Sequence, residues 1–119
     1  MKQHVQIMTL HEDAGAEAEQ LLAQPPVDLE ELKKHYFLCE YVPLDEMPDS
    51  HPEIVAWCMR TSRTTAWRTR QMRPLQHMDL VDVGGTAYLI YDKAMARNKR
   101  IDHTTIPETI NYVIVRINL

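Results

Sequence analysis

Glycine and cysteine are scarce in this sequence, and their scarcity excludes several kinds of site. The 119 residues include only three Gly and two Cys. The Gly residues form neither a P-loop nor a dinucleotide-binding fingerprint, so no backbone cradle for nucleotide phosphates is expected. Cys39 and Cys58 form no C-x-x-C pair, which argues against a disulfide framework and a zinc ribbon. Both have apolar neighbours, and we expect them to pack as small core residues.

Long apolar runs are also missing. Apolar stretches such as residues 112–115 are far shorter than the roughly 20 residues that span a bilayer. The first five residues contain no apolar run of the kind found in signal peptides. We therefore expect a cytoplasmic protein that has no membrane partner.

Common catalytic signatures are absent as well. Ser50 and Ser62 lie outside any G-x-S-x-G sequence, and the six His form no H-E-x-x-H motif. From this we predict no catalytic centre, no cofactor and no bound metal. One alternative stays open, because His77 and Asp79 would project from the same side of an extended segment. In that arrangement the Asp79 carboxylate could orient the imidazole of an enzyme site.

What the sequence does contain is an ordinary globular composition. It is 45% hydrophobic and 25% charged, which is average for a soluble protein, and we expect one domain over residues 1–119. Periodicity, capping residues and prolines predict strands at residues 5–9, 36–42, 78–83, 86–91 and 109–119, and helices at residues 14–24, 29–34 and 52–60. Residues 92–100 fit either a short helix or a loop.

The order of these elements predicts an α+β fold. We expect a mixed or mainly antiparallel sheet with two or three short helices on one face. Gly84 and Gly85 join two alternating runs and predict a tight hairpin, because a primed turn needs positive φ angles. The last predicted strand is apolar on both sides, which is typical of a strand in the middle of a covered sheet.

The charge is unevenly distributed along the chain. The net charge is -4, but residues 1–59 hold twelve acids and three Lys, a net charge of -9. Residues 60–100 hold nine bases and three acids, a net charge of +6. Such an asymmetry bears on the partners of a protein and not on its fold.

Two groups of residues are therefore candidates for binding a partner. The basic group lies within residues 60–73 and contains an aromatic side chain that could stack on a base: Arg60, Arg63, Trp67, Arg68, Arg70 and Arg73. The acidic group could present carboxylates to a basic partner surface: Glu17, Glu19 and Glu31. The plainer interpretation, which we favour, is that the two groups neutralise each other within one fold. We likewise favour a core position for Trp67.

One short motif adds a family resemblance. Residues 73–81 read R-P-L-Q-H-M-D-L-V and lead into the hairpin that contains Tyr88. This is similar to the R-S-L-S-x-x-D-V-V motif of the YodL-like small domain, and the order of features over residues 36–91 resembles that family. The matching positions are Arg73, Leu75, Asp79 and Val81; Pro74 and Gln76 replace the two Ser of the family.

The resemblance implies an accessory protein of a conjugative element or phage, without a known catalytic centre. Small acidic proteins of such elements are often inhibitors of host defence, including anti-CRISPR proteins. The leading expectation is therefore a non-catalytic protein-interaction domain that binds and inhibits a host protein or ribonucleoprotein complex. The alternative is a small nucleic-acid-binding domain that uses the Arg/Trp-rich segment 60–73. A homodimer is a further open arrangement, because an apolar strand such as residues 36–42 or 109–119 could lie at a sheet edge and pair with a second copy.

Overall fold

The computed structural model describes residues 3–119, so Met1 and Lys2, which the charge count and the signal-peptide argument included, lie outside it. The described chain forms a six-stranded sheet of order β2-β1-β3-β4-β6-β5, in which all neighbouring strands are antiparallel. The strands are β1 (His4–Leu10), β2 (Tyr36–Pro43), β3 (Leu80–Val83), β4 (Thr86–Asp92), β5 (Thr104–Thr105) and β6 (Tyr112–Arg116). The α+β class and the antiparallel sheet are thereby confirmed.

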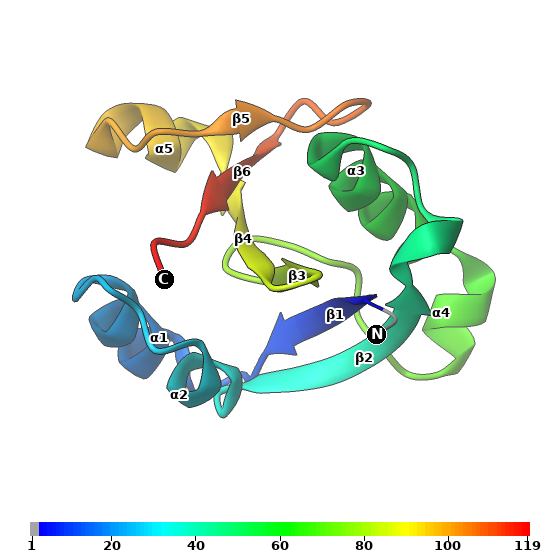
Figure 1. Ribbon diagram of the computed structural model, residues 1–119, viewed down its shortest axis with the longest axis horizontal. Helices are drawn as coiled ribbons and strands as arrows, with labels where there is room; N and C mark the ends of the chain where they lie inside the picture. Colours follow the sequence, from blue (N-terminus) through cyan, green and yellow to red (C-terminus); the bar gives the residue numbers. More distant parts are fainter. Residues whose placement is uncertain (1–2) are drawn as a thin grey trace.

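Helices cover both faces of the sheet. One face carries α1 (Gly15–Leu22), α2 (Leu29–Lys33) and α5 (Lys93–Lys99), and the other carries α3 (His51–Thr61) and α4 (Thr65–Thr69), as Figure 1 shows. A 3-10 turn, η1 (Leu44–Glu46), follows β2. Three short helices therefore lie on one face, and the prediction did not include the two further helices on the other face. That second face is covered because the strands carry apolar side chains on both sides: Val81 and Val83 face α3, whereas Leu80 faces the opposite core.

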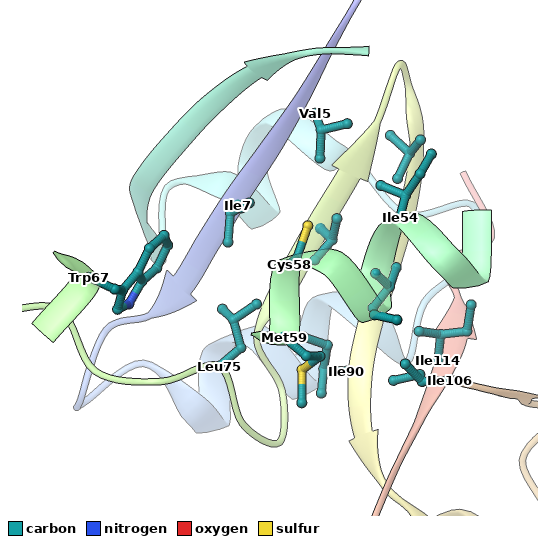
Figure 2. Close-up of a cluster of buried hydrophobic side chains, with 14 residues drawn as sticks. Val5, Ile7, Ile54, Cys58, Met59, Trp67, Leu75, Ile90, Ile106 and Ile114 are labelled. Atoms are coloured by element: carbon teal, nitrogen blue, oxygen red, sulfur yellow. The ribbon is translucent and has the colours of Figure 1, made fainter. Parts of the chain in front are cut away.

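The core under α3 and α4 is the larger of the two. Figure 2 shows Cys58 and Met59 of α3 pointing toward the sheet, with Trp67 of α4 at one end of the same cluster. Cys58 is fully buried, and this burial raises the pKa of its thiol to about 12. Cys39 is half-buried against the same core, and both cysteines are free thiols.

Local signals account for several element boundaries. The predicted hairpin is confirmed, since Gly84 and Gly85 both have positive φ, at 58° and 100°, between β3 and β4. Ser50 caps α3 by accepting a hydrogen bond from the Glu53 N–H. Asp92 caps the segment that fitted either a helix or a loop, and this segment is the helix α5.

Other elements differ from the prediction. The basic segment contains the short helix α4, which begins after the capping residue Thr64. The last strand is β6, which is shorter than residues 109–119 and lies second from the edge beside the two-residue β5. Its two-sided apolar character is nevertheless explained, because Val113 and Ile114 are buried in opposite cores. β6 lies inside the sheet only because it pairs with β5, a segment too short to have a sequence signal.

Candidate functional site

The basic segment is largely engaged within the fold. The Arg73 guanidinium binds both Asp79 carboxylate oxygens, with N···O distances of 2.6 and 2.7 Å. Arg63 donates to the backbone carbonyls of Leu75, at 2.9 Å, and Met59, at 3.0 Å. These guanidinium groups therefore hold loops of the protein itself.

The other candidate residues of the basic segment differ in their exposure and in the partners of their side chains. Arg60 forms an exposed ion pair with Glu108, and Arg70 pairs with Glu40 at 2.8 Å. Trp67 is 2% exposed, which fits the core interpretation and leaves no ring face for stacking on a base. Arg68 is exposed, and its guanidinium has no hydrogen bond or ion pair to any residue from 3 to 119. A continuous row of free arginines is thus not present on this surface.

The acidic candidates lie on the other face of the sheet. Glu17 and Glu19 are exposed on α1, and Glu31 is exposed on α2, where it forms an ion pair with Lys34 at 2.7 Å. The structure therefore places the acidic group and the segment 60–73 on opposite faces. The basic groups within 60–73 are neutralised instead by Glu40, Asp79 and Glu108.

His77 and Asp79 do not form a pair. Asp79 is fully buried and accepts hydrogen bonds from the backbone N–H groups of Leu10, at 2.9 Å, and Gln76, at 2.7 Å, in addition to those from Arg73. His77 turns elsewhere, and its Nδ1 accepts a hydrogen bond from the Asp92 N–H at 2.9 Å. Every oxygen of Asp79 is occupied by structural donors, which leaves it no position from which to orient an imidazole. Among residues 3–119 no group of three His, Cys, Asp or Glu is arranged to hold a metal.

His77 is expected to make the stability of the fold sensitive to pH. Burial lowers its pKa below the ordinary 6.5; Asp92, Glu19 and Asp79 oppose this shift, and Lys99 adds to it. Below pH 6.5 the unfolded chain then binds more protons at this site than the folded chain does. The stabilising contribution of neutral His77 to the free energy of unfolding is therefore fully present above pH 6.5. It is lost as the pH falls through the lowered pKa of His77 in the folded protein.

The measurement is urea unfolding at about pH 7.5 and pH 5 for the wild type and His77→Gln. We expect the wild type to lose more free energy of unfolding between the two pH values than the variant loses. His103→Gln, which alters an exposed imidazole, is the control and should lose as much as the wild type. Equal losses in the wild type and His77→Gln would contradict the expectation.

A surface that the charge pattern did not indicate lies along β2. Phe37, Leu38 and Tyr41 are 67%, 52% and 51% exposed, and we call these three residues the β2 patch. Direct cross-strand partners share a face, so Leu38 and Tyr41, opposite Met8 and Gln6, project toward the α2 side. Phe37 projects toward the α4 side, so the β2 patch wraps around the edge strand.

The side chains of the β2 patch are partly fixed. The ring of His4 stacks on Tyr41 with centroids 4.0 Å apart, and His11 meets Phe37 edge-on at 4.8 Å. Such contacts reduce the rotamer freedom that a side chain would lose on binding. The patch therefore presents preorganised aromatic rings.

The backbone of β2 is less accessible than its side chains. Arg70 donates to the Cys39 carbonyl at 2.9 Å, and the Tyr41 N–H donates to the Glu40 carboxylate at 3.3 Å. The register also shifts between Ile7 and Met8, where β1 meets β2. Capping charges and irregular pairing are means by which proteins protect an edge strand from adding another strand. The side chains of β2 are thus a better docking element than its backbone.

The chain segment that contains the β2 patch is acidic, although Arg70, the C-cap residue of α4, contacts β2. Residues 36–53, which comprise β2, η1 and the start of α3, contain no Lys or Arg and five acids: Glu40, Asp45, Glu46, Asp49 and Glu53. All but Glu40 are exposed, and Glu40 is half-buried against Arg70. An apolar patch on an acidic segment is complementary to an apolar site bordered by cations.

Comparisons with known proteins add no further identification. No known protein family, curated protein or solved structure matches the chain significantly. The resemblance to the YodL-like domain therefore stays a prediction. Within residues 3–119 no helix has the length and apolar character needed to cross a membrane.

Sequence reasoning identified β2 as an aromatic strand and as one of two candidate edge strands, but it did not predict which strand lies outermost or that the side chains of β2 are exposed. The alternation of β2 is the same whether it lies inside a sheet or at an edge. Its edge position depends on the pairing of β1 with β3, which is more than 70 residues away along the chain. No local signal could have provided that information.

Proposed function

We propose that this protein is a protein-interaction domain, and that the β2 patch is its contact surface. The observation that carries the proposal is the exposure of Phe37, Leu38 and Tyr41 on one strand of a sheet whose other apolar side chains are mostly covered. Aromatic and aliphatic anchors of this kind supply most of the binding energy at protein interfaces. The partner that fits is a protein surface with an apolar pocket surrounded by Lys and Arg.

Charge supports this choice of partner. The five acids of residues 36–53 would speed encounter with a basic surface and would disfavour an acidic one. Because four of these acids are exposed, salt should screen their attraction. The acidic residues Glu17, Glu19 and Glu31 add negative charge on the α1 and α2 side and extend the same preference.

The narrower expectation, an inhibitor of a host defence or nucleic-acid-processing complex, is compatible with this surface and stays a prediction. Such complexes carry basic surfaces, which is the chemistry that an acidic patch would meet. The alternative nucleic-acid function loses its stacking platform, since Trp67 is buried. Arg68 is still available for contact with a phosphate in this alternative. The alternative predicts binding of single-stranded oligonucleotides at low salt, and this binding should fall steeply as salt is raised.

Selection of peptides from a random displayed library tests the proposal without knowledge of the partner. We expect the enriched peptides to combine apolar and basic residues and to bind more weakly at higher salt. The double variant Leu38→Lys/Tyr41→Lys should weaken their binding at least about tenfold, which corresponds to about 1.4 kcal/mol. The affinity is measured by fluorescence anisotropy with a labelled peptide.

Ile110→Lys is the matched control, because Ile110 is 82% exposed and lies outside β2. It should leave peptide binding unchanged. If the selected peptides bind the double variant as tightly as the wild type, the β2 patch is not the contact surface. Binding that is lost only in Arg68→Glu, together with oligonucleotide binding at low salt, would favour the nucleic-acid alternative instead.

A further inference from the structure

An apolar cleft lies between α1 and α5, away from the β2 patch. Figure 1 shows these helices on the same side of the sheet, with β6 and the C-terminal segment between them. The cleft has a volume of about 430 Å³, and its walls include Leu22, Val27, Leu89, Tyr91 and Val115. This volume falls within the roughly 300–1,000 Å³ that is typical of small-molecule sites.

The charges at the cleft differ from those of the whole chain. Three charged residues line it, Lys99, Arg116 and Glu19, which gives a net charge of +1 in a protein of net charge -4. Within residues 3–119, neither Lys99 nor Arg116 forms an ion pair. The cleft is therefore a locally cationic site with apolar walls.

The position of Lys99 follows from the packing of α5. Ala96 is fully buried and Met95 packs against the same core, so this face of α5 is turned toward the sheet. Lys99 lies three residues after Ala96 and four after Met95, so it shares that face of α5. A long lysine side chain can pack its methylene groups along apolar walls while its ammonium group meets an anion.

His77 adds a hydrogen-bond donor near the same place. Its ring packs against Tyr91, a cleft residue, with centroids 4.4 Å apart, and Glu19 and Lys99 are near enough to influence its pKa. Because Nδ1 accepts the Asp92 N–H, the neutral ring carries its proton on Nε2. That N–H has no acceptor among residues 3–119.

We propose that this cleft binds a small amphiphilic monocarboxylate, with its apolar body against Leu89, Val115 and Leu22 and its carboxylate at Lys99. Burial of the apolar body away from water favours its binding to these walls. The carboxylate is preferred over an ammonium group because two cations and one acid line the cleft. This site is separate from the β2 patch, so the proposal of a carboxylate site can be correct or wrong independently of the proposed interaction surface.

Titration with decanoate, below the concentration at which it forms micelles, tests the proposal. We expect saturable binding by isothermal titration calorimetry, with amide shifts of Leu89 and Val115 in a nitrogen-15 correlation spectrum. Decylammonium has the same apolar chain and the opposite charge, and it should bind at least about tenfold more weakly. Lys99→Met, which keeps an unbranched side chain but removes the charge, should weaken decanoate binding at least about fivefold.

Two tryptophan variants of α1 locate the binding. Ala23, the exposed C-cap residue of α1, lines the cleft, so Ala23→Trp should fill it and abolish decanoate binding. Ala16 is exposed on the same helix and does not line the cleft, so Ala16→Trp should bind like the wild type. The proposal is overturned if decanoate does not bind, if decylammonium binds equally well, or if binding survives Ala23→Trp.

Discussion

Replacing Asp79 by Ala is expected to lower the free energy of unfolding by about 3–5 kcal/mol, the range typical of breaking a buried ion pair. The Asp79 side chain is 0% exposed, and the Arg73 side chain that it pairs with is 36% exposed. The carboxylate also accepts the N–H groups of Leu10 and Gln76, which would be left without these acceptors. One side chain thus ties the end of β1 to the loop that precedes β3. Urea unfolding followed by circular dichroism measures the loss.

Two further variants separate charge from contact. Asp79→Asn keeps the shape of the side chain but removes its charge, and it should also be strongly destabilising because Arg73 is left unpaired. Glu108→Ala breaks the exposed ion pair with Arg60 and should cost less than about 1 kcal/mol. If Asp79→Ala costs no more than Glu108→Ala does, the network around Asp79 is not a main support of the fold.

Replacing Trp67 by Ala is the second change with a large expected effect, also about 3–5 kcal/mol of unfolding free energy. Trp67 is among the largest fully buried side chains and anchors α4, a helix of only five residues. A helix this short depends on packing for its stability. Its indole N–H also donates to the Arg73 carbonyl at 2.9 Å. Loss of the ring should therefore release α4 from the sheet.

Trp67→Phe distinguishes the two roles of this side chain. It keeps most of the apolar volume and removes the hydrogen bond, so we expect a smaller loss than for Trp67→Ala. Thermal unfolding and urea unfolding of both variants provide the measurement. A stable Trp67→Ala variant whose only defect is weaker oligonucleotide binding would contradict the core role and favour the nucleic-acid alternative.

The elements that the sequence predicts well are those with local causes. Ser50 caps α3, Asp28 accepts from the Glu31 N–H at the start of α2, and the Gly84-Gly85 pair makes the hairpin. Each signal acts within a few residues, so it can be read without knowing the rest of the fold. The α+β class follows from the order of such elements.

The position of each element in the fold could not be predicted in the same way. The placement of α3 and α4 on the second face depends on which side of each strand is covered, and the alternating apolar pattern of the chain fits either side. Similarly, Arg63 and Arg73 resemble free binding residues in the sequence because their acceptors, Leu75, Asp79 and the Leu10 carbonyl, are set by tertiary structure. Trp67 was correctly interpreted as a core residue from its size alone.

The pairing of β1 has a consequence for how the chain folds during its synthesis. β1 lies inside the sheet, and its neighbours are β2 on one side and β3 on the other. The first partner follows within residues 36–43, but the second is formed only by residues 80–83. Until β3 leaves the ribosome, β1 keeps one unpaired edge and apolar side chains exposed on both faces. That interval is when a nascent chain of this protein is most exposed to aggregation and most in need of a chaperone.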